Sequence, residues 1–227
     1  MRVLNIGSLN LDHVYNVDHI VQPGETEATG ELNIHLGGKG MNQSVALAKA
    51  GVETYHGGMI GDDGQPFLDA CKEFGVHGDY IRTIDTKSGH AIIQIDKNAQ
   101  NCILLYGGAN QKLTADYVDD VLASFGAEDI LLLQNEVNQL PYIVDRAYEK
   151  GMQVALNPSP FNEKLSAVDM QKVSIFLLNE IKLISILLKS LTISIITEYI
   201  HFYIQLYGFI TPLLRPHVGK TPLLLIL

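Results

Sequence analysis

A glycine turn that opens a helix is the segment of this sequence best suited to binding chemistry. Residues 37–40 read Gly-Gly-Lys-Gly, and glycines let the backbone approach a ligand closely because they carry no Cβ. The apolar run over residues 44–50 predicts a helix, and Gly51 after it is typical of a C-terminal cap. A helix start presents unpaired N–H groups and the positive end of the helix dipole, and Asn42 adds an amide that donates and accepts. We therefore expect a site for a small, oxygen-rich ligand.

Two carboxylates follow separate apolar, strand-like runs and are candidates for the same site. Asp12 comes after the run at residues 4–7, and Glu136 comes after the run at residues 130–133. Ligands of open α/β sheets collect at the carboxyl ends of strands, so the two positions are compatible with one pocket. An ionised carboxylate accepts charge-assisted hydrogen bonds from two neighbouring hydroxyls, which a sugar offers. The alternative stays open that Asp12 caps a turn and that Glu136 is one more solvated carboxylate.

Charge and motif content argue against several other functions. The net charge of −9 disfavours nucleic acid and anionic membranes as partners. Cys71 and Cys102 form neither a disulfide framework nor a metal-ligand pattern, and the eight histidines show no zinc motif. Asp62 and Asp63 are expected to cap a helix over residues 66–74 rather than to bind a metal. The start of the sequence runs directly into a strand, so we expect a cytoplasmic protein.

The remaining pattern predicts an α/β fold. After residue 110, strand-like and helix-like runs alternate, which indicates a parallel sheet with right-handed crossovers. The expected helices are 114–125, begun by a Thr114 cap, and 140–150, and the expected strands are 130–133, 153–156 and 174–178. Earlier in the chain, short strand candidates favour hairpins over residues 12–17, 28–36, 90–96 and 102–106.

The composition changes sharply near residue 181. Residues 1–180 carry a net charge of −12, whereas residues 181–227 carry +3 and are rich in Ile and Leu without helical or strand periodicity. We interpret residues 181–227 as a replaced or frameshifted end, which would leave the strand at 174–178 with an open edge. A membrane anchor is the alternative, but the longest stretch without charged residues, 199–214, has 16 residues where a spanning helix needs about 20.

Several motifs within residues 1–180 occur in the order and spacing of one protein family. Besides the glycine turn, they are the segments 8–12 (Ser-Leu-Asn-Leu-Asp), 23–26 (Pro-Gly-Glu-Thr), 58–64 (Gly-Met-Ile-Gly-Asp-Asp-Gly), 106–110 (Tyr-Gly-Gly-Ala-Asn), 133–136 (Leu-Gln-Asn-Glu), 156–160 (Leu-Asn-Pro-Ser-Pro) and 178–180 (Leu-Asn-Glu). Together they resemble the family of sugar and nucleoside kinases that shares the ribokinase fold. The segment Gly-Gly-Lys-Gly-x-Asn-Gln at 37–43 is similar to the ribokinase branch, because fructokinase-like members tend to lack the lysine.

The resemblance implies a fold, a set of site residues and several partners. The fold is α/β: a ribokinase-like, mostly parallel sheet flanked by helices, with a small β lid from segments within 12–36 and 81–106, and with the C-terminal part of the fold absent. The lid covers the sugar and often makes a homodimer contact. The implied sugar-binding positions are Asn10, Leu11, Asp12, Gly38, Lys39, Gly40, Met41, Asn42 and Glu136, and Asn179 is implied to lie near ATP. Magnesium would bridge the phosphates of ATP, potassium is a candidate activator, and no residue of this chain is assigned to a metal.

The implied activity is ATP-dependent phosphorylation of a pentose, with D-ribose at its 5-hydroxyl as the first expectation. Family members carry their catalytic base in a late Gly-Ala-Gly-Asp segment, and this sequence has no Asp after Asp169. We therefore expect the chain as given to lack the base and to be inactive or nearly so. Two alternatives stay open. One is a non-catalytic sugar-binding remnant, and the other is a kinase of a related sugar or nucleoside, such as deoxyribose or a pseudouridine-like substrate.

Overall fold

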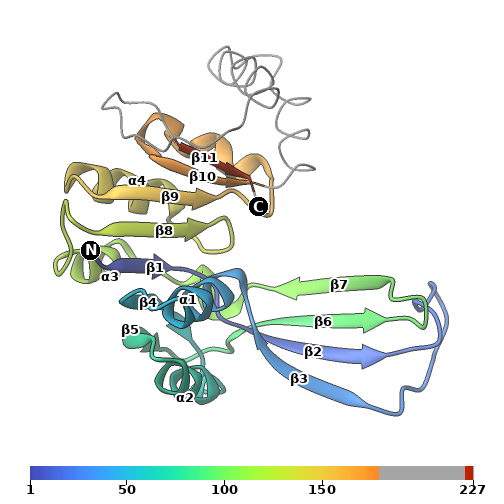
Figure 1. The fold of residues 1–227 in the computed structure, drawn as a ribbon. Helices are drawn as coiled ribbons and strands as arrows, with labels where there is room; N and C mark the ends of the chain where they lie inside the picture. Colours follow the sequence, from blue (N-terminus) through green and yellow to red (C-terminus); the bar gives the residue numbers. More distant parts are fainter. Residues whose placement is uncertain (179–222, 227) are drawn as a thin grey trace, which may run out of the picture.

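Two β-sheets form the framework of the molecule in the computed structural model, which describes residues 1–178 and 223–226. Within these residues the larger sheet has seven strands, all paired in parallel, in the order β11-β10-β9-β8-β1-β4-β5 (Figure 1). Its strands are β1 (Val3–Ile6), β4 (Thr54–Ile60), β5 (His77–Thr83), β8 (Ile130–Gln134), β9 (Gln153–Asn157), β10 (Ile175–Leu178) and β11 (Leu223–Ile226). We call it the base sheet.

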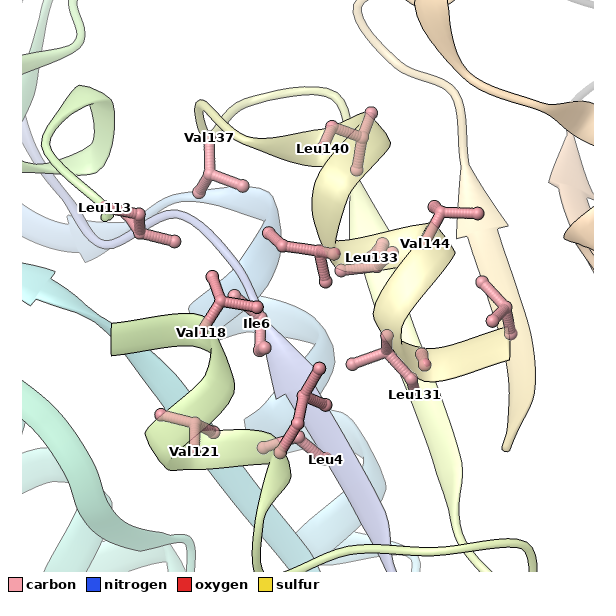
Figure 2. Packing of buried hydrophobic residues seen from close by; sticks show 14 of the residues in the cluster. Leu4, Ile6, Leu113, Val118, Val121, Leu131, Leu133, Val137, Leu140 and Val144 are labelled. Carbon is pink, nitrogen blue, oxygen red and sulfur yellow. The ribbon is translucent and has the colours of Figure 1, made fainter. Parts of the chain in front are cut away.

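Alternate residues of the central strand β1 point to opposite faces of the base sheet, and helices cover both faces. On one face, Leu4 and Ile6 belong to the largest apolar cluster, against which α3 (Ala115–Leu122) and α4 (Leu140–Glu149) pack. Figure 2 shows side chains of β1, β8, α3 and α4 meeting in this cluster. Burying an aliphatic side chain of this kind stabilises the fold by roughly 1.5–3 kcal/mol.

The opposite face of the base sheet is covered by α1 (Lys39–Lys49) and α2 (Gln65–Phe74). Val3 of β1 lies in a small cluster against Leu47 of α1, and Phe67 of α2 packs with Ile60 of β4 in another. Three short 3-10 helices lie in the connections, η1 (Gly108–Gln111), η2 (Glu163–Ala167) and η3 (Met170–Lys172). The apolar residues of the chain therefore form two layers, one on each side of a buried parallel sheet.

A second sheet projects from one end of the base sheet, and we call it the lid sheet (Figure 1). It consists of β2 (Asn10–Asn16), β3 (Leu32–Gly37), β6 (Gly89–Ile95) and β7 (Asn101–Tyr106), in the order β3-β2-β6-β7. The central pair β2 and β6 is parallel, and the two outer strands pair in antiparallel fashion. The expected α/β fold with a small second sheet is confirmed.

The helix boundaries and the strands that sequence analysis missed have local physical causes. The expected Thr114 cap is confirmed, since its hydroxyl oxygen accepts from the Tyr117 N–H at 3.2 Å. The strands β4 and β5 were not predicted from the sequence. The first contains two consecutive glycines at 57–58, and the second is a mostly polar strand at the sheet edge, so neither shows an apolar pattern.

Two sequence-based expectations are wrong. Asp62 and Asp63 do not cap α2, whose N-cap residue is Gly64 without a side-chain cap. Instead, Asp63 accepts from the Ser88 N–H at 2.9 Å and Asp62 pairs with Lys87, so both tie this turn to the approach to the lid sheet. The outer edge of β10 is not open either, because β11 pairs with it in parallel. The other residues of the 181–227 segment lie outside the described residues.

A row of buried polar side chains lies between β1, β4, β8 and α1. Asn5 donates to the Gly40 carbonyl at 2.8 Å and to the Ser44 hydroxyl at 2.9 Å, and Gln134 donates to Asn5 at 3.0 Å. The Ser44 hydroxyl proton is then directed to Nδ1 of His56, 2.8 Å away. All four side chains are fully buried. Burial lowers the pKa of His56 to about 4, because the cationic ring loses its hydration.

His56 predicts a specific acid sensitivity of folding. The unfolded chain takes up a proton at His56 near pH 6.5, whereas the folded chain resists protonation until about pH 4. The stabilisation from the neutral ring is therefore present above pH 6.5 and is lost as the pH falls, by up to about 1.4 kcal/mol per pH unit. We expect urea denaturation between pH 7 and pH 4.5 to show a shallower loss of unfolding free energy in His56→Asn than in the wild type. Parallel curves for the two proteins would contradict this assignment.

Candidate functional site

The first turn of α1 packs directly on the chain that joins β1 to β2. The Met41 N–H donates to the Ser8 carbonyl at 3.0 Å, and the Gly40 N–H donates to the Ser8 hydroxyl at 3.2 Å. A Cβ at Gly40 would lie 2.4 Å from the Ser8 nitrogen, and one at Gly38 would lie 2.6 Å from the Ser8 carbonyl oxygen. Gly38 also has a φ of +91°, which side chains rarely adopt. The glycines therefore allow a helix start to contact the base sheet backbone.

Glu136 follows β8 and points its carboxylate at this helix start. Its side chain is only 6 % exposed, and it accepts hydrogen bonds from the Ser8 hydroxyl, the Lys39 N–H at 3.1 Å and the Lys39 ammonium. The positive end of the α1 dipole adds to the attraction. Both the backbone and the side chain of Lys39 thus hold the carboxylate, which compensates the cost of burying a charge.

Asp12 supplies the second carboxylate from β2 of the lid sheet. It is half-buried and lies against Gly37, where a Cβ would come within 2.0 Å of Oδ2. Burial raises the pKa of Asp12, and the negative charge of Glu136 raises it further, while His35, His13 and Lys39 oppose the shift. The two carboxylates are 124 positions apart in the sequence but close enough in space to influence each other's charge.

A cavity of about 280 Å³ opens beside Glu136, between the carboxyl ends of the base strands and the lid sheet. A liquid water takes about 30 Å³, so the space suits one small polar molecule. The walls combine side chains of the β1–β2 and β8–α4 connections, the lid strand β7, η1 and the 160–164 segment: Ser8, Asn10, Leu105, Gly107, Asn110, Gln111, Asn135, Glu136, Pro160, Asn162 and Lys164. Amides and one carboxylate dominate the lining, which therefore matches a ligand rich in hydroxyl groups.

A larger hollow of about 820 Å³ lies between β5 and α3. Its walls include Arg82, Asp116 and Asp120 but none of the predicted site residues, and it is remote from the glycine turn. Within the described residues, no cluster of three His, Cys, Asp or Glu side chains is arranged to hold a metal ion. The smaller cavity is the candidate site because the buried carboxylate, the helix start and the lid sheet meet there.

The structure brings some of the predicted site residues to the cavity and places others beside it. Asn10 and Glu136 line it. Asp12 and Lys39 lie close enough to interact electrostatically with each other, and the backbone at Gly38 and Gly40 contacts Ser8. The Met41 side chain is buried in the core, Leu11 packs against the same cluster, and Asn42 is exposed on the first turn of α1. The predicted nucleotide contact, Asn179, lies outside the described residues.

Sequence analysis missed several amide side chains of the cavity wall. Asn110 and Asn135 belong to motifs noted in the sequence, but no role was predicted for either. A signal was available for Asn135, which comes directly after the base strand β8, but not for Asn110, which follows the lid strand β7. Gln111 and Asn162 carried no comparable signal, because their approach to the site depends on how the connections after β7 and β9 fold back.

Comparison with known proteins identifies the class. Residues 2–180 match the pfkB family carbohydrate kinases, and the chain belongs to this family. It is 34 % identical over 174 residues to the ribokinase of Haemophilus influenzae, covering 73 % of this chain and 57 % of that protein. It is 36 % identical over 169 residues to a bifunctional ribokinase/ribose-5-phosphate isomerase A of Fructilactobacillus sanfranciscensis, covering 71 % of this chain and 31 % of that protein. The chain thus spans between about a third and three fifths of the relatives it matches.

Solved structures give the same class. The ribokinase of Cryptococcus neoformans in complex with ADP has a TM-score of 0.71 and 33 % identity, over 82 % of this chain and 61 % of that one. The ribokinase of Arabidopsis thaliana complexed with ribose and ATP has a TM-score of 0.70 and 26 % identity, over 90 % of this chain and 69 % of that one. No helix in the described part of the chain is long and apolar enough to cross a bilayer.

The glycine turn makes a prediction about stability that separates backbone strain from close packing. Gly38→Ala combines a positive φ with a clash against Ser8, so we expect it to lower the unfolding free energy by about 2–4 kcal/mol. Gly24→Ala has a positive φ in open space and should cost about 1 kcal/mol, and Gly30→Ala, which has neither feature, should cost nothing measurable. Urea denaturation of the three variants tests this order. Equal losses of unfolding free energy in Gly38→Ala and Gly24→Ala would show that the clash with Ser8 adds nothing to the cost.

Proposed function

We propose that this chain binds a pentose, D-ribose in the first place, in the cavity beside Glu136, as the sugar-binding portion of an ATP-dependent ribokinase. The observation that carries the proposal is a small polar cavity between the base sheet and the lid sheet, lined by Asn10 and Glu136, with Asp12 close enough to Glu136 to interact with its charge. Relatives named ribokinase, including one solved with ribose and ATP, support the choice of sugar.

The geometry suits recognition of neighbouring hydroxyls. Glu136 lines the cavity and Asp12 lies near it, and each ionised carboxylate can accept hydrogen bonds from more than one hydroxyl. The Lys39 ammonium and N–H hold the Glu136 carboxylate in one orientation. The lid strand β7 contributes the apolar Leu105 to the cavity wall, so water would be partly excluded from the bound sugar.

The phosphoryl donor would be ATP, since ribokinases have been solved with ADP and ATP, and Asn179 is proposed to lie near it. Magnesium would neutralise the phosphates and potassium is a candidate activator, and neither is assigned to a residue of this chain. Because the 227 residues contain no Gly-Ala-Gly-Asp, we propose that this chain binds the sugar without transferring a phosphoryl group to it.

Ribose binding by the two carboxylates is testable on the chain as it stands. We expect isothermal titration to detect ribose binding by the wild type, and Asp12→Asn or Glu136→Gln to weaken it about 10–100-fold, because each removes a charge-assisted hydrogen bond. Glu73→Gln, on the exposed face of α2, is the matched control and should bind as the wild type does. Undiminished affinity in both site variants would remove the basis of the proposal.

Two alternatives are distinguished by parallel measurements. A deoxyribokinase of Salmonella typhi is 29 % identical over 188 residues, so 2-deoxyribose is the second ligand to titrate. Tighter binding of 2-deoxyribose than of ribose would favour a kinase of a related sugar. An ATP-coupled assay with ribose separates a non-catalytic sugar-binding remnant from an enzyme. No turnover is expected, and measurable ribose-dependent ATP consumption would overturn the proposed loss of chemistry.

The outer face of the lid sheet suits a second copy of the chain. Ile34, His13, Ile92 and Leu104 are paired across its four strands in one row, so they share the face opposite Asp12. Ile34 is 56 % and Leu104 is 68 % exposed, which is unusual for side chains of this size. A partner lid packed on this row would remove it from water, and we propose a homodimer formed through the lid.

The proposed dimer predicts a change in mass when the row is charged. Light scattering coupled to size exclusion should give a dimer for the wild type and a monomer for Leu104→Lys, because a buried unpaired ammonium opposes association. Tyr148→Lys on α4, also an exposed large side chain, is the control and should remain dimeric. A monomeric wild type, or a dimer that persists in Leu104→Lys, would contradict a lid-mediated contact.

A further inference from the structure

Asn110 lies where the chain returns from the lid sheet to the base sheet. It belongs to η1, which follows β7. Asn110 is only 1 % exposed, although it contributes to the cavity wall. Its side chain is linked to the segment where the chain first enters the lid sheet. The Leu9 N–H donates to Asn110 Oδ1 at 3.0 Å, and Asn110 Nδ2 donates to the Leu9 carbonyl at 3.2 Å. The amide therefore pairs with Leu9 as a neighbouring backbone strand would.

The same amide also contacts the connection from β5 to β6, where the chain enters the lid sheet for the second time. A Cβ at Gly89, where β6 begins, would lie 2.1 Å from Asn110 Nδ2 and 2.3 Å from Asn10 Oδ1. The starts of β2 and β6 and the segment after β7 thus meet around one buried side chain. The position of the lid sheet over the cavity depends on this packing, because three of the four connections between the sheets, all but that from β3 to α1, meet at this side chain.

The hydrogen bonds of Asn110 determine which way the Asn10 amide faces. Backbone groups fix Asn110 without ambiguity, since an N–H of Leu9 requires the oxygen and the carbonyl of Leu9 requires the NH2 group. The second proton of Asn110 Nδ2 goes to Asn10 at 2.8 Å, so the atom of Asn10 that receives it must be its oxygen, Oδ1. The NH2 group of Asn10 therefore lies at the opposite end of the amide from Asn110. Within the described residues it donates to no protein group.

We propose that Asn110 is a positioning residue that makes Asn10 present its NH2 group, rather than its oxygen, to the ligand. This inference rests on the proposed sugar site and deepens it. The site then offers a donor at Asn10 beside acceptors at Asp12 and Glu136. A ligand hydroxyl next to Asn10 is held as an acceptor of the amide proton and a donor to a carboxylate. A ligand without an oxygen at that position leaves a buried NH2 group unpaired, which disfavours deoxy sugars.

The variant Asn110→Asp tests this role with little change of shape. One oxygen of the new carboxylate still accepts from the Leu9 N–H, but the other repels the Leu9 carbonyl and Asn10 Oδ1. Asn10 must turn its NH2 group toward the new charge and its oxygen toward the cavity. We expect ribose affinity to fall by about 10-fold or more, the scale of one hydrogen bond to a poorly matched partner.

Asn138 provides a matched control beside Asn110, whose carbonyl accepts from the Asn138 N–H at 3.3 Å, but outside the cavity wall. Its Oδ1 accepts from the Leu113 N–H at 2.9 Å and its Nδ2 donates to the Leu113 carbonyl at 2.8 Å, which repeats the pairing of Asn110 with Leu9. It does not line the cavity. Asn138→Asp should destabilise the fold to a similar degree as Asn110→Asp, as measured by thermal melting, but should change ribose affinity by less than about 2-fold.

A double-mutant cycle with Asn10→Ala separates positioning from a general structural effect. If Asn110 acts through Asn10, the change Asn110→Asp will alter ribose affinity by less than about 2-fold in the Asn10→Ala background. If the effect of Asn110→Asp is only structural, the double variant will lose ribose affinity by the product of the two single-variant factors. A multiplicative result, or an Asn138→Asp loss equal to that of Asn110→Asp, would overturn the proposal.

A measurement on the unmodified chain keeps the proposal testable if Asn110→Asp does not fold. Side-chain amide NMR should show slow hydrogen exchange for the Asn110 NH2 protons, which have protein acceptors, and fast exchange for those of Asn10. Added ribose should slow the Asn10 exchange. Protected Asn10 protons in the sugar-free protein would refute the orientation. If titration finds no ribose binding at all, the proposed function fails, while the sugar-free exchange pattern still decides how Asn10 faces.

Discussion

The contact between the start of α1 and the β1–β2 connection is the constraint on which the site depends. It brings a helix N-terminus within hydrogen-bonding distance of Ser8, and only glycines at 38 and 40 leave space for this approach. Buried amides support this contact. Asn5 donates a hydrogen bond to the Gly40 carbonyl, and Gln134 donates to the side chains of Asn5 and Gln43. These buried amides are stabilising only as a complete network, because each would cost free energy if left unpaired.

This constraint explains why a buried carboxylate is tolerated at Glu136. Three donors, from Ser8 and from the backbone and side chain of Lys39, surround it. A carboxylate has about four lone-pair positions, so room for a ligand hydroxyl remains. These donors belong to the protein itself, so the proposed sugar would not have to reorder the helix start. Preorganisation of this kind reduces the cost of association.

The sequence was sufficient to predict the fold class and the segments that carry the site. It was not sufficient to predict how the side chains of these segments are oriented. The glycine turn could be identified from its glycines and the apolar helix that follows, and Asp12 and Glu136 because each follows a run with a clear apolar pattern. The strand β4 was missed because two glycines interrupt its pattern, and β5 because it is a polar edge strand. Asn110 could not be given a role, because its importance arises from a pairing with Leu9 across 101 positions of the chain. Asp62 and Asp63 were misassigned because a local cap and a contact with the 87–88 segment have the same sequence signature.

The central place of β1 in the base sheet has a consequence for how the molecule assembles. Both neighbours of this strand come later in the sequence, since β4 and β8 begin about 50 and 127 positions further along, so its two edges stay unpaired until those segments have been made. Closing these long loops costs chain entropy before the strand contacts can stabilise the fold. Folding should therefore be slow relative to helical proteins of similar size, and the completion of β8 should be the event that commits the nascent polypeptide to its native topology.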